Sequence, residues 1–530
     1  MSQGGNFLRS ATGLVREFTA ADAALLAVGS IAPGFAWIFV FTSEWFVFPG
    51  VNLPVSAALI GILALLQGVF YVLMTSAMPR SGGTTYVALS RLVNPALGLA
   101  MPFIFFAYMV FTTALTATAV IGVGLNSQLA TFAAVTNNSG LASIASSLSS
   151  TSVEFVTAGL LVIITGLIVI SGSRWIKIVN WISFIAILTV LFAMLYIMGT
   201  TSQAQFTADV NKFAGSGAYQ AVISKAHSSG WSVPSDWLVP TLLSLPLSWF
   251  NLNGYQWNTY YSGEIRRITR SMSFAVLFSI TFATAYYVIM SLFMQTSFGI
   301  DFINSAGYLY NTGTASALSI APYPNDLVLI INSNPILNYL MIASFILAGY
   351  SFIANTYLIA SRSLLAWSFD RVIPSAFGAV NEKLHGPVRA MLVVMLFFLL
   401  STSVYVFFPT YQADVGAAFL AITAILLDGL TGIFLPIRKA IFDKAPEIVR
   451  KKVAGIPVVS ILGAYSLVFT AYLFYALVTT PAIGGPLGND TELTIVVAFV
   501  LGLLTYFTMK AYHKRHGLDI TLAFKELPPE

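Results

Sequence analysis

Long apolar stretches alternate with short polar segments along most of the chain. A transmembrane helix needs about 20 consecutive apolar residues, and stretches of this kind recur twelve times. We therefore predict an all-α polytopic membrane protein with twelve transmembrane helices. The expected spans are 20–48, 53–77, 98–123, 153–172, 175–199, 237–262, 271–297, 336–361, 388–408, 412–436, 457–479 and 491–512.

Composition supports this class and excludes several others. Hydrophobic residues make up 57% of the 530 residues and charged residues only 8%, a balance typical of membrane proteins. The chain has no cysteine, which excludes disulfides, thiolate metal sites and thiol catalysis. Its four histidines are scattered, and no phosphate-binding GxxxxGK[ST] motif occurs. We therefore expect no metal, no cofactor, no ATP-driven transport and no enzymatic activity.

The distribution of basic residues predicts the orientation. If the N-terminus is cytoplasmic, all of the 25 lysines and arginines except Lys212 and Lys225 fall in cytoplasmic segments. Cytoplasmic loops of membrane proteins are enriched in these residues. Both termini are therefore expected in the cytoplasm, in a multi-pass protein of the plasma membrane. The basic cluster at 438–452 follows from this topology and does not indicate nucleic-acid binding.

The first span contains residues that disrupt a helix near its midpoint. Gly29, Pro33 and Gly34 lie within the stretch LLAVGSIAPGFAW at 25–37. In hydrocarbon, irregular backbone is tolerated only inside protein or beside a cavity. An interrupted helix offers a positive dipole end to anions and bare carbonyls to cations. This combination suits a zwitterion, although a helix that only kinks at Pro33 explains the pattern equally well.

The sixth span carries a second interruption. Asn251, Asn253, Gly254 and Gln256 lie near its midpoint, where polar side chains are costly unless they face protein or water. The two interrupted spans enter the membrane from opposite faces because five spans separate their starts. Matching interruptions in two halves of opposite topology indicate an inverted-repeat transporter. The expected division is 1–17 cytoplasmic, 18–199 first repeat, 200–235 extracellular loop, 236–438 second repeat, 439–456 basic loop, 457–512 two further spans and 513–530 cytoplasmic.

Three segments resemble the amino acid–polyamine–organocation (APC) permeases. They are MPRSGGTTYVALSR at 78–91 after the second span, YSGEIRR at 261–267 and SRSLLAWSFDRVIP at 361–374. The resemblance runs from about residue 18 to 438 in the same order and spacing. It implies the leucine-transporter-like fold of five-plus-five inverted helices, in which spans 1, 2, 6 and 7 move against spans 3, 4, 8 and 9.

The resemblance also implies where a substrate binds. The carboxylate would meet N–H groups of the first interruption, the amino group would meet carbonyls of both interruptions, and aromatic side chains would cover the substrate. The residues that match these positions are Ser30, Ile31, Ala32, Pro33 and Gly34 of the first span, and Trp249, Phe250, Asn251, Leu252 and Gly254 of the sixth, with Trp249 and Phe250 as the lid.

The coupling ion and the gates have several candidates. Asp428 is an acid well inside a span, so it is either a proton or cation site or a structural acceptor. Ser351, Asn355 and Thr356 of the eighth span offer oxygen ligands suited to sodium, but such residues also hold membrane helices together. The coupling ion is therefore either a proton or a sodium ion. Three charged residues are expected in an ion-pair network at the inner face, namely Asp22, Arg80 and Glu264. Glu44 lies near the outer end of the first span, where it either joins a gate or, as we expect, meets water.

The substrate class follows from the charges that the interruptions lack. No acid lies there to bind a second ammonium group, and no deep arginine lies there to bind a second carboxylate. We therefore expect a secondary carrier for neutral or apolar amino acids, working by ion-coupled symport or exchange. Phe105, Tyr108 and Phe111 are possible pocket walls. A polyamine or nucleobase carrier of the same fold is the alternative, and a channel is also compatible with the sequence.

Overall fold

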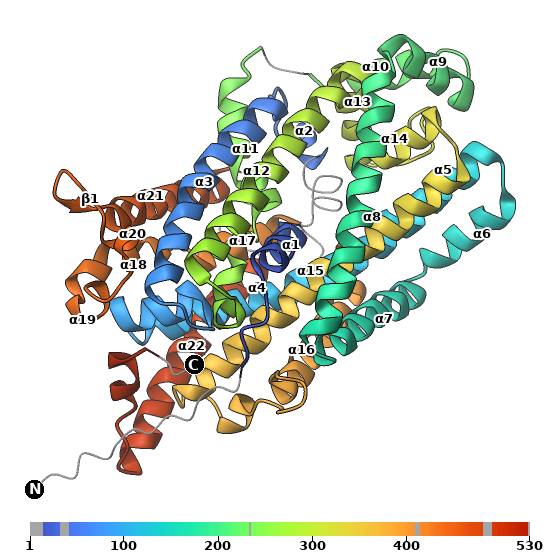
Figure 1. Ribbon diagram of the computed structural model, residues 1–530. Helices are drawn as coiled ribbons and strands as arrows, with labels where there is room; N and C mark the ends of the chain where they lie inside the picture. The colour runs from blue at the N-terminus through green and yellow to red at the C-terminus, as the bar shows by residue number, and fades with distance from the viewer. Residues whose placement is uncertain (1–13, 32–41, 233–234, 409–413, 481–489, 528–530) are drawn as a thin grey trace, which may run out of the picture.

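A computed structural model describes residues 14–31, 42–232, 235–408, 414–480 and 490–527. Long helices run side by side through the molecule, and shorter helices lie at the ends of the bundle (Figure 1). The strands in these ranges are β1 (Lys452–Val453) and β2 (Ile456–Pro457), which form one short hairpin. The predicted all-α class is confirmed.

Most of the described chain is helical. The first part of the chain contains α1 (Ala20–Ile31), α2 (Thr42–Val47), α3 (Leu53–Ala77), η2 (Thr84–Val93), α4 (Leu97–Ala119), η3 (Val120–Ser127), α5 (Gln128–Thr136), α6 (Ser139–Leu148), α7 (Thr151–Ile170) and α8 (Ser173–Thr200). The middle contains α9 (Gln203–Ala214), α10 (Ala218–Ser228), α11 (Leu238–Leu252), η4 (Trp257–Glu264), α12 (Ile268–Met294), η5 (Gln295–Gly299), α13 (Ile300–Asn311) and α14 (Pro324–Ile331). The last part contains α15 (Pro335–Phe369), η6 (Ser375–Gly378), α16 (Val388–Phe407), α17 (Asp414–Ala424), α18 (Asp428–Phe434), η8 (Leu435–Ile437), α19 (Lys439–Phe442), α20 (Glu447–Arg450), α21 (Val458–Thr479), α22 (Asp490–Arg515) and η10 (Ile520–Lys525).

Ten helical stretches among the described residues are long and apolar enough to cross a membrane, against twelve expected from the sequence. The two missing spans are the first and the sixth, which the sequence predicts to be interrupted. The first is represented by the 12-residue α1 and the 6-residue α2. The sixth is divided into the 15-residue α11 and the 3₁₀ helix η4. Each piece is too short to span a bilayer alone.

The two ends of the bundle differ. The long polar loops of the sequence fold into the short helices α5, α6, α9, α10, α13 and α14, which gather at one end (Figure 1). We call this the loop end. The opposite end carries η2, η4 and the segment between α15 and α16, and therefore all three APC-like sequence motifs. We call it the motif end.

Small residues allow the close helix contacts that hold the bundle together. A Cβ atom on Gly429 of α18 would lie 2.4 Å from the carbonyl oxygen of Gly463 on α21. One on Gly61 of α3 would lie 2.3 Å from the side chain of Thr284 on α12. Membrane helices pack through such small-residue faces because lipid supplies no hydrophobic drive for their association. These contacts fix α3, α12 and α18 around the interrupted helices.

Candidate functional site

The first and sixth spans meet inside the bundle. The helix α11 ends at Leu252, Asn253 leaves helical geometry, and Gly254 has φ +129°. A Cβ atom on Gly254 would lie 2.6 Å from the carbonyl oxygen of Ser30, one residue before the end of α1. Only glycine fits here, because both its backbone angle and its contact exclude a side chain. The ends of α1 and α11 therefore touch each other.

Amide side chains form a hydrogen-bonded cluster at the interruption of the sixth span. Gln256 donates from Nε2 to Asn253 Oδ1 at 2.7 Å, and the backbone N–H of Gly254 donates to Gln256 Oε1 at 3.3 Å. Asn253 donates from Nδ2 to the Tyr108 hydroxyl of α4 at 2.7 Å. Gln256 thus provides an acceptor for one backbone N–H of the interruption, and Asn253 connects the interruption to the third span.

Gly29, the first helix-disrupting residue of the first span, does not interrupt the helix α1. Gly29, Ser30 and Ile31 are all helical, and the Ser30 hydroxyl donates back to the Leu26 carbonyl at 2.9 Å. The expectation that Gly29 favours an irregular backbone is therefore wrong, because Gly29 lies within α1 and allows close packing. A Cβ atom there would lie 3.1 Å from the Cβ of Ser351 on α15. The candidates Ala32, Pro33 and Gly34 lie outside the described residues.

The remaining substrate candidates occupy the last turn of α11. Trp249 and Leu252 are fully buried, and the Trp249 Nε1–H donates to the Tyr255 hydroxyl at 3.2 Å. Half-buried Phe250 lies edge-on to the ring of Tyr108, with centroids 6.4 Å apart. Of the two proposed lid residues, Phe250 is thus the one that faces the third span. The Asn251 carbonyl accepts a hydrogen bond from the Tyr287 hydroxyl at 3.1 Å.

The sodium candidates of the eighth span lie where α15 packs against α1. Asn355 donates from Nδ2 to the carbonyls of Leu26 at 3.2 Å and Ser351 at 2.8 Å, and its Oδ1 accepts from the Tyr261 hydroxyl at 3.0 Å. Thr356 is hydrogen-bonded through Oγ1 to Thr113 of α4 at 2.8 Å. These groups connect α15 to its neighbours in the described conformation.

Asp428 lies at the start of α18 in a buried polar cluster. Its Oδ2 accepts hydrogen bonds from the Tyr71 hydroxyl of α3 and from Thr85 Oγ1 of η2, both at 2.9 Å. Its Oδ1 is buried and has no hydrogen-bond partner among the described residues. The hydroxyl of Tyr260 on η4 is also buried without one. Asp428 is thus surrounded by hydroxyl groups and forms no ion pair with a described residue.

The charged candidates of the motif end are separated from each other. Glu264 forms a two-point ion pair with Arg362 of α15, with Oε1 to Nε and Oε2 to Nη2 both at 2.8 Å. Asp22 instead caps α1 by accepting from the Thr19 backbone N–H at 3.0 Å. The backbone carbonyl of Arg80 accepts from the Ser262 hydroxyl at 3.0 Å. In the described conformation Asp22 is not part of the Glu264 ion pair, and the partner of Glu264 is Arg362, which was not among the candidates from sequence.

The chain segment before α1 covers this ion pair. Phe18 pairs with Ile265 in an isolated parallel bridge, and the backbone N–H groups of Glu17 and Phe18 both donate to the Glu264 carbonyl, at 2.9 and 3.0 Å. The Phe18 ring also lies against Tyr261, with centroids 6.3 Å apart. Backbone and side-chain contacts of Glu264 therefore close the motif end together.

A protein-family model described as amino acid permease matches residues 18–504. The chain belongs to this amino acid permease family. The comparison with curated proteins finds no match. The permease is therefore a multi-pass membrane protein whose family transports amino acids, and the APC resemblance seen in the sequence motifs is confirmed.

The structure also shows what two of the APC-like motifs do in this permease. Arg91 of η2 forms a buried ion pair with Asp370 at the end of α15, and the Tyr86 hydroxyl donates to the same carboxylate at 2.6 Å. The guanidinium lies over the ring of Phe524 in η10, 5.1 Å from its centroid. These contacts tie η2, α15 and the C-terminal helix η10 into one unit. The motifs are recognisable in the sequence, but their contact with each other was not predicted.

A further buried acid lies at the loop end of the permease. Asp326 on α14 is fully buried, and its Oδ2 accepts from the Ser127 hydroxyl at 2.9 Å. Burial raises the pKa of this carboxyl to about 7. Asn325 beside it donates to Gln128 Oε1 at 3.4 Å. These contacts dock α14 against the extension of α4.

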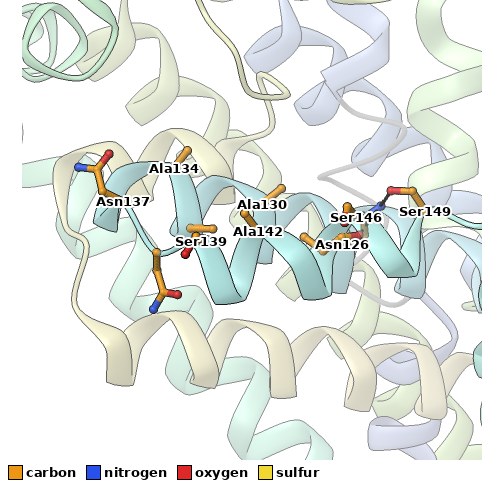
Figure 2. A pocket seen from close by; sticks show the side chains of 11 residues that line it. Asn126, Ala130, Ala134, Asn137, Ser139, Ala142, Ser146 and Ser149 are labelled. Carbon is orange, nitrogen blue, oxygen red and sulfur yellow. Dashed lines mark hydrogen bonds between the residues drawn. The ribbon is translucent and has the colours of Figure 1, made fainter.

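Figure 2 shows a groove at the loop end of the permease, between α5 and α6. It has a volume of about 500 Å³ and is lined by alanine, serine and asparagine side chains. Asn126 and Ser149 close one end through a 2.8 Å hydrogen bond. The lining contains no charged group, so the groove offers no chemistry comparable to that of the interrupted helices.

Proposed function

We propose that this permease is a secondary active transporter that moves neutral or apolar amino acids across the plasma membrane by alternating access. The observation that carries the proposal is the contact between the Ser30 carbonyl and Gly254, which brings the ends of two interrupted spans together. Irregular backbone at membrane depth is tolerated only where it is buried in protein or lines a cavity, and transporters form their substrate sites at such interruptions.

Helix dipoles support this location for the amino group of the substrate. The helix α11 ends at this contact, and the C-terminus of a helix carries partial negative charge. This end favours an ammonium group placed beside it and beside the Ser30 carbonyl. The carboxylate is assigned to N–H groups that follow α1, on the basis of the family resemblance. Ala32 and Gly34 belong to that stretch, whereas Pro33 has only a carbonyl to offer.

Aromatic side chains beside the contact support an apolar substrate side chain. Tyr108 lies edge-on to both Phe250 and Trp257, with centroids 6.4 and 6.2 Å apart. No lysine, arginine, aspartate or glutamate occurs from residue 245 to 257. Such walls suit a neutral amino acid better than a polyamine, because a second ammonium group would need a carboxylate partner.

The motif end supplies the inner gate in this proposal. With both termini in the cytoplasm, the Glu264–Arg362 ion pair and the Phe18 bridge lie on the cytoplasmic side and close it. Opening must then break contacts made by η4, which directly follows the interruption. The division into repeats 18–199 and 236–438 is part of the same proposal.

Asp428 is the residue that couples transport to an ion, and the ion is a proton. Its surroundings favour it over the sodium candidates. Its Oδ1 has no partner among the described residues, whereas Ser351, Asn355 and Thr356 are engaged in helix contacts. A buried carboxyl with hydroxyl neighbours and no cation is suited to bind and release a proton. Asp428→Asn should reduce uptake driven by a proton gradient and still permit exchange. Unchanged gradient dependence would make Asp428 structural.

The test is counterflow with purified protein in proteoliposomes. Vesicles loaded with each of the twenty amino acids, putrescine or uracil should accumulate the matching labelled compound, and only neutral amino acids should give saturable counterflow. Putrescine or uracil as the active substrate would overturn the substrate class. Unsaturable flux would indicate a channel.

Two glycine variants test the site itself. Gly254→Ala should abolish counterflow, because the new Cβ would overlap the Ser30 carbonyl. Gly313→Ala is the matched control, since Gly313 also has positive φ but a Cβ there meets nothing within 4 Å. Equal transport by the two variants would refute the assignment of the site to this contact.

A further inference from the structure

A second carboxyl group is buried among hydroxyl groups, away from Asp428. Glu44 of α2 is fully buried, although its place near the end of a span led us to expect contact with water. Its Oε1 and Oε2 accept from the Ser248 hydroxyl of α11 at 3.0 and 2.9 Å. The Ser248 hydroxyl also contacts Ser56 Oγ of α3 at 2.5 Å, and Ser56 contacts Ser244 at 3.1 Å. Three helices therefore meet at one carboxyl group.

No positive charge balances this group. Glu44 forms no ion pair with a described residue, and α2, α3 and α11 contain no lysine, arginine or histidine. The helix α13 also packs on α2, and its one charged residue is the exposed acid Asp301. An ionised carboxylate that is buried without a cation is strongly disfavoured. In this conformation Glu44 must therefore be neutral or hold a cation.

The spacing of the hydroxyl groups favours a proton over a metal ion. The chain Ser244–Ser56–Ser248–Glu44 is in continuous hydrogen-bonding contact, with oxygen separations of 2.5 to 3.1 Å. An ion among these oxygens would have to push them apart to make room for its coordination shell. The amide of Asn251, 3.5 Å from Oε1, adds only a weak donor. A protonated carboxyl group fits the cluster without any rearrangement.

We propose that Glu44 is a proton-binding group of the transport cycle, protonated while α2 packs on α11 and deprotonated when the two helices separate. This rests on the transport function proposed above but not on the role of Asp428. Ser248, the partner of Glu44, precedes the interruption of the sixth span. Asp428 lies beside η2 and η4, and η4 follows the same interruption. Proton binding would thus be linked to helix contacts on both sides of the substrate.

The experiment measures how far a pH gradient drives accumulation in proteoliposomes. Each coupled proton multiplies the steady-state accumulation ratio by about ten for every unit of pH gradient. Glu44→Gln keeps the shape of the side chain but cannot release a proton. With a one-unit gradient, it should lower the accumulation ratio about tenfold relative to the wild-type protein while counterflow persists. Asp301→Asn, an exposed acid on the neighbouring helix, should leave the ratio unchanged.

A second variant tests the local chemistry. Ser248→Ala removes the hydroxyl donor that favours the ionised carboxyl group. It should keep the accumulation ratio and shift the pH of half-maximal uptake upward. No shift in this variant would contradict the proposed role of the cluster.

The outcomes separate this inference from the transport function itself. An unchanged accumulation ratio in Glu44→Gln would overturn the inference and leave the transporter proposal intact. Loss of counterflow in a folded, monodisperse Glu44→Gln protein would also overturn it, since Glu44 would then serve substrate binding. If Glu44→Gln abolished a dependence of uptake on sodium and left its dependence on protons unchanged, Glu44 would bind a metal ion and the inference would be wrong. Absence of counterflow in the wild-type protein would refute both proposals.

Discussion

Glu264→Gln should loosen the motif end of the permease. The glutamate meets Arg362 through two charge-assisted hydrogen bonds of 2.8 Å, and the side chains of Arg362 and Glu264 are only 3% and 7% exposed. Replacing the carboxylate by an amide leaves one acceptor for two guanidinium N–H groups and no opposite charge. The buried Arg362 would then be left without its ion-pair partner.

The expected size of the effect follows from this geometry. Removing one partner of a buried ion pair costs about 3–5 kcal/mol, because the remaining charge stays desolvated. In an opened motif end Arg362 would reach water, so the cost falls on the closed conformation. Since about 1.4 kcal/mol corresponds to a factor of ten, the open population should rise by roughly 100- to 4,000-fold.

Cysteine labelling can measure this shift because the chain contains no native cysteine. Ser262 is fully buried beside the gate and donates to the Arg80 carbonyl at 3.0 Å, so Ser262→Cys places one protected thiol there. When opening is fast relative to the reaction, the rate of maleimide labelling follows the open fraction. Glu264→Gln should raise that rate, whereas Glu382→Gln, an exposed acid of the same end, should not. Equal rates in both backgrounds would refute the gate assignment.

Three further predictions concern stability. The carboxyl of Asp326 stays protonated in the folded protein up to its pKa of about 7 but ionises near 3.8 when unfolded, so this contribution to stability should fall as pH rises between these values. Asp326→Asn should flatten that slope in thermal melts at several pH values, and an unchanged slope would contradict the reasoning. Asp370→Asn should destabilise the protein by about 3 kcal/mol, measured by denaturation in detergent, because it leaves Arg91 buried and unpaired. Gly463→Ala should cost about 1–3 kcal/mol by overpacking against Gly429, and a neutral result would show that α18 and α21 can separate freely.

The local patterns of the sequence predicted much of the fold. Ten expected spans correspond to helical stretches that are long and apolar enough to cross a membrane, and the two others are the ones with Gly, Pro and amide residues at their centres. An apolar stretch partitions into the bilayer, and a helix-breaking residue disrupts the backbone at its own position. Both effects are local, so they can be interpreted without knowing which helices pack together. Gly29 was misinterpreted as a residue that disrupts the helix, because a glycine inside a span can also allow close packing, here against Ser351.

The candidate site was only partly predictable. Asn253 and Gly254 stand out in the sequence as polar or flexible residues within a span, and the structure places both in the interruption. The partner of Glu264 was not predictable, since Arg362 lies 98 residues away and several other arginines are equally plausible from charge alone. Glu44 was misjudged because its position near the end of a span suggests water.

The sequence by itself determined that this protein is an all-α membrane permease and that its sixth span is interrupted near Asn253 and Gly254, because these properties depend on local apolar length and backbone chemistry. Only the tertiary structure decided that the Ser30 carbonyl meets Gly254, that Arg362 neutralises Glu264, and that Glu44 is enclosed by serine hydroxyls. Each of these depends on which helix faces which. That choice is made by packing of the whole bundle, where small residues allow close approach and buried polar groups must find partners.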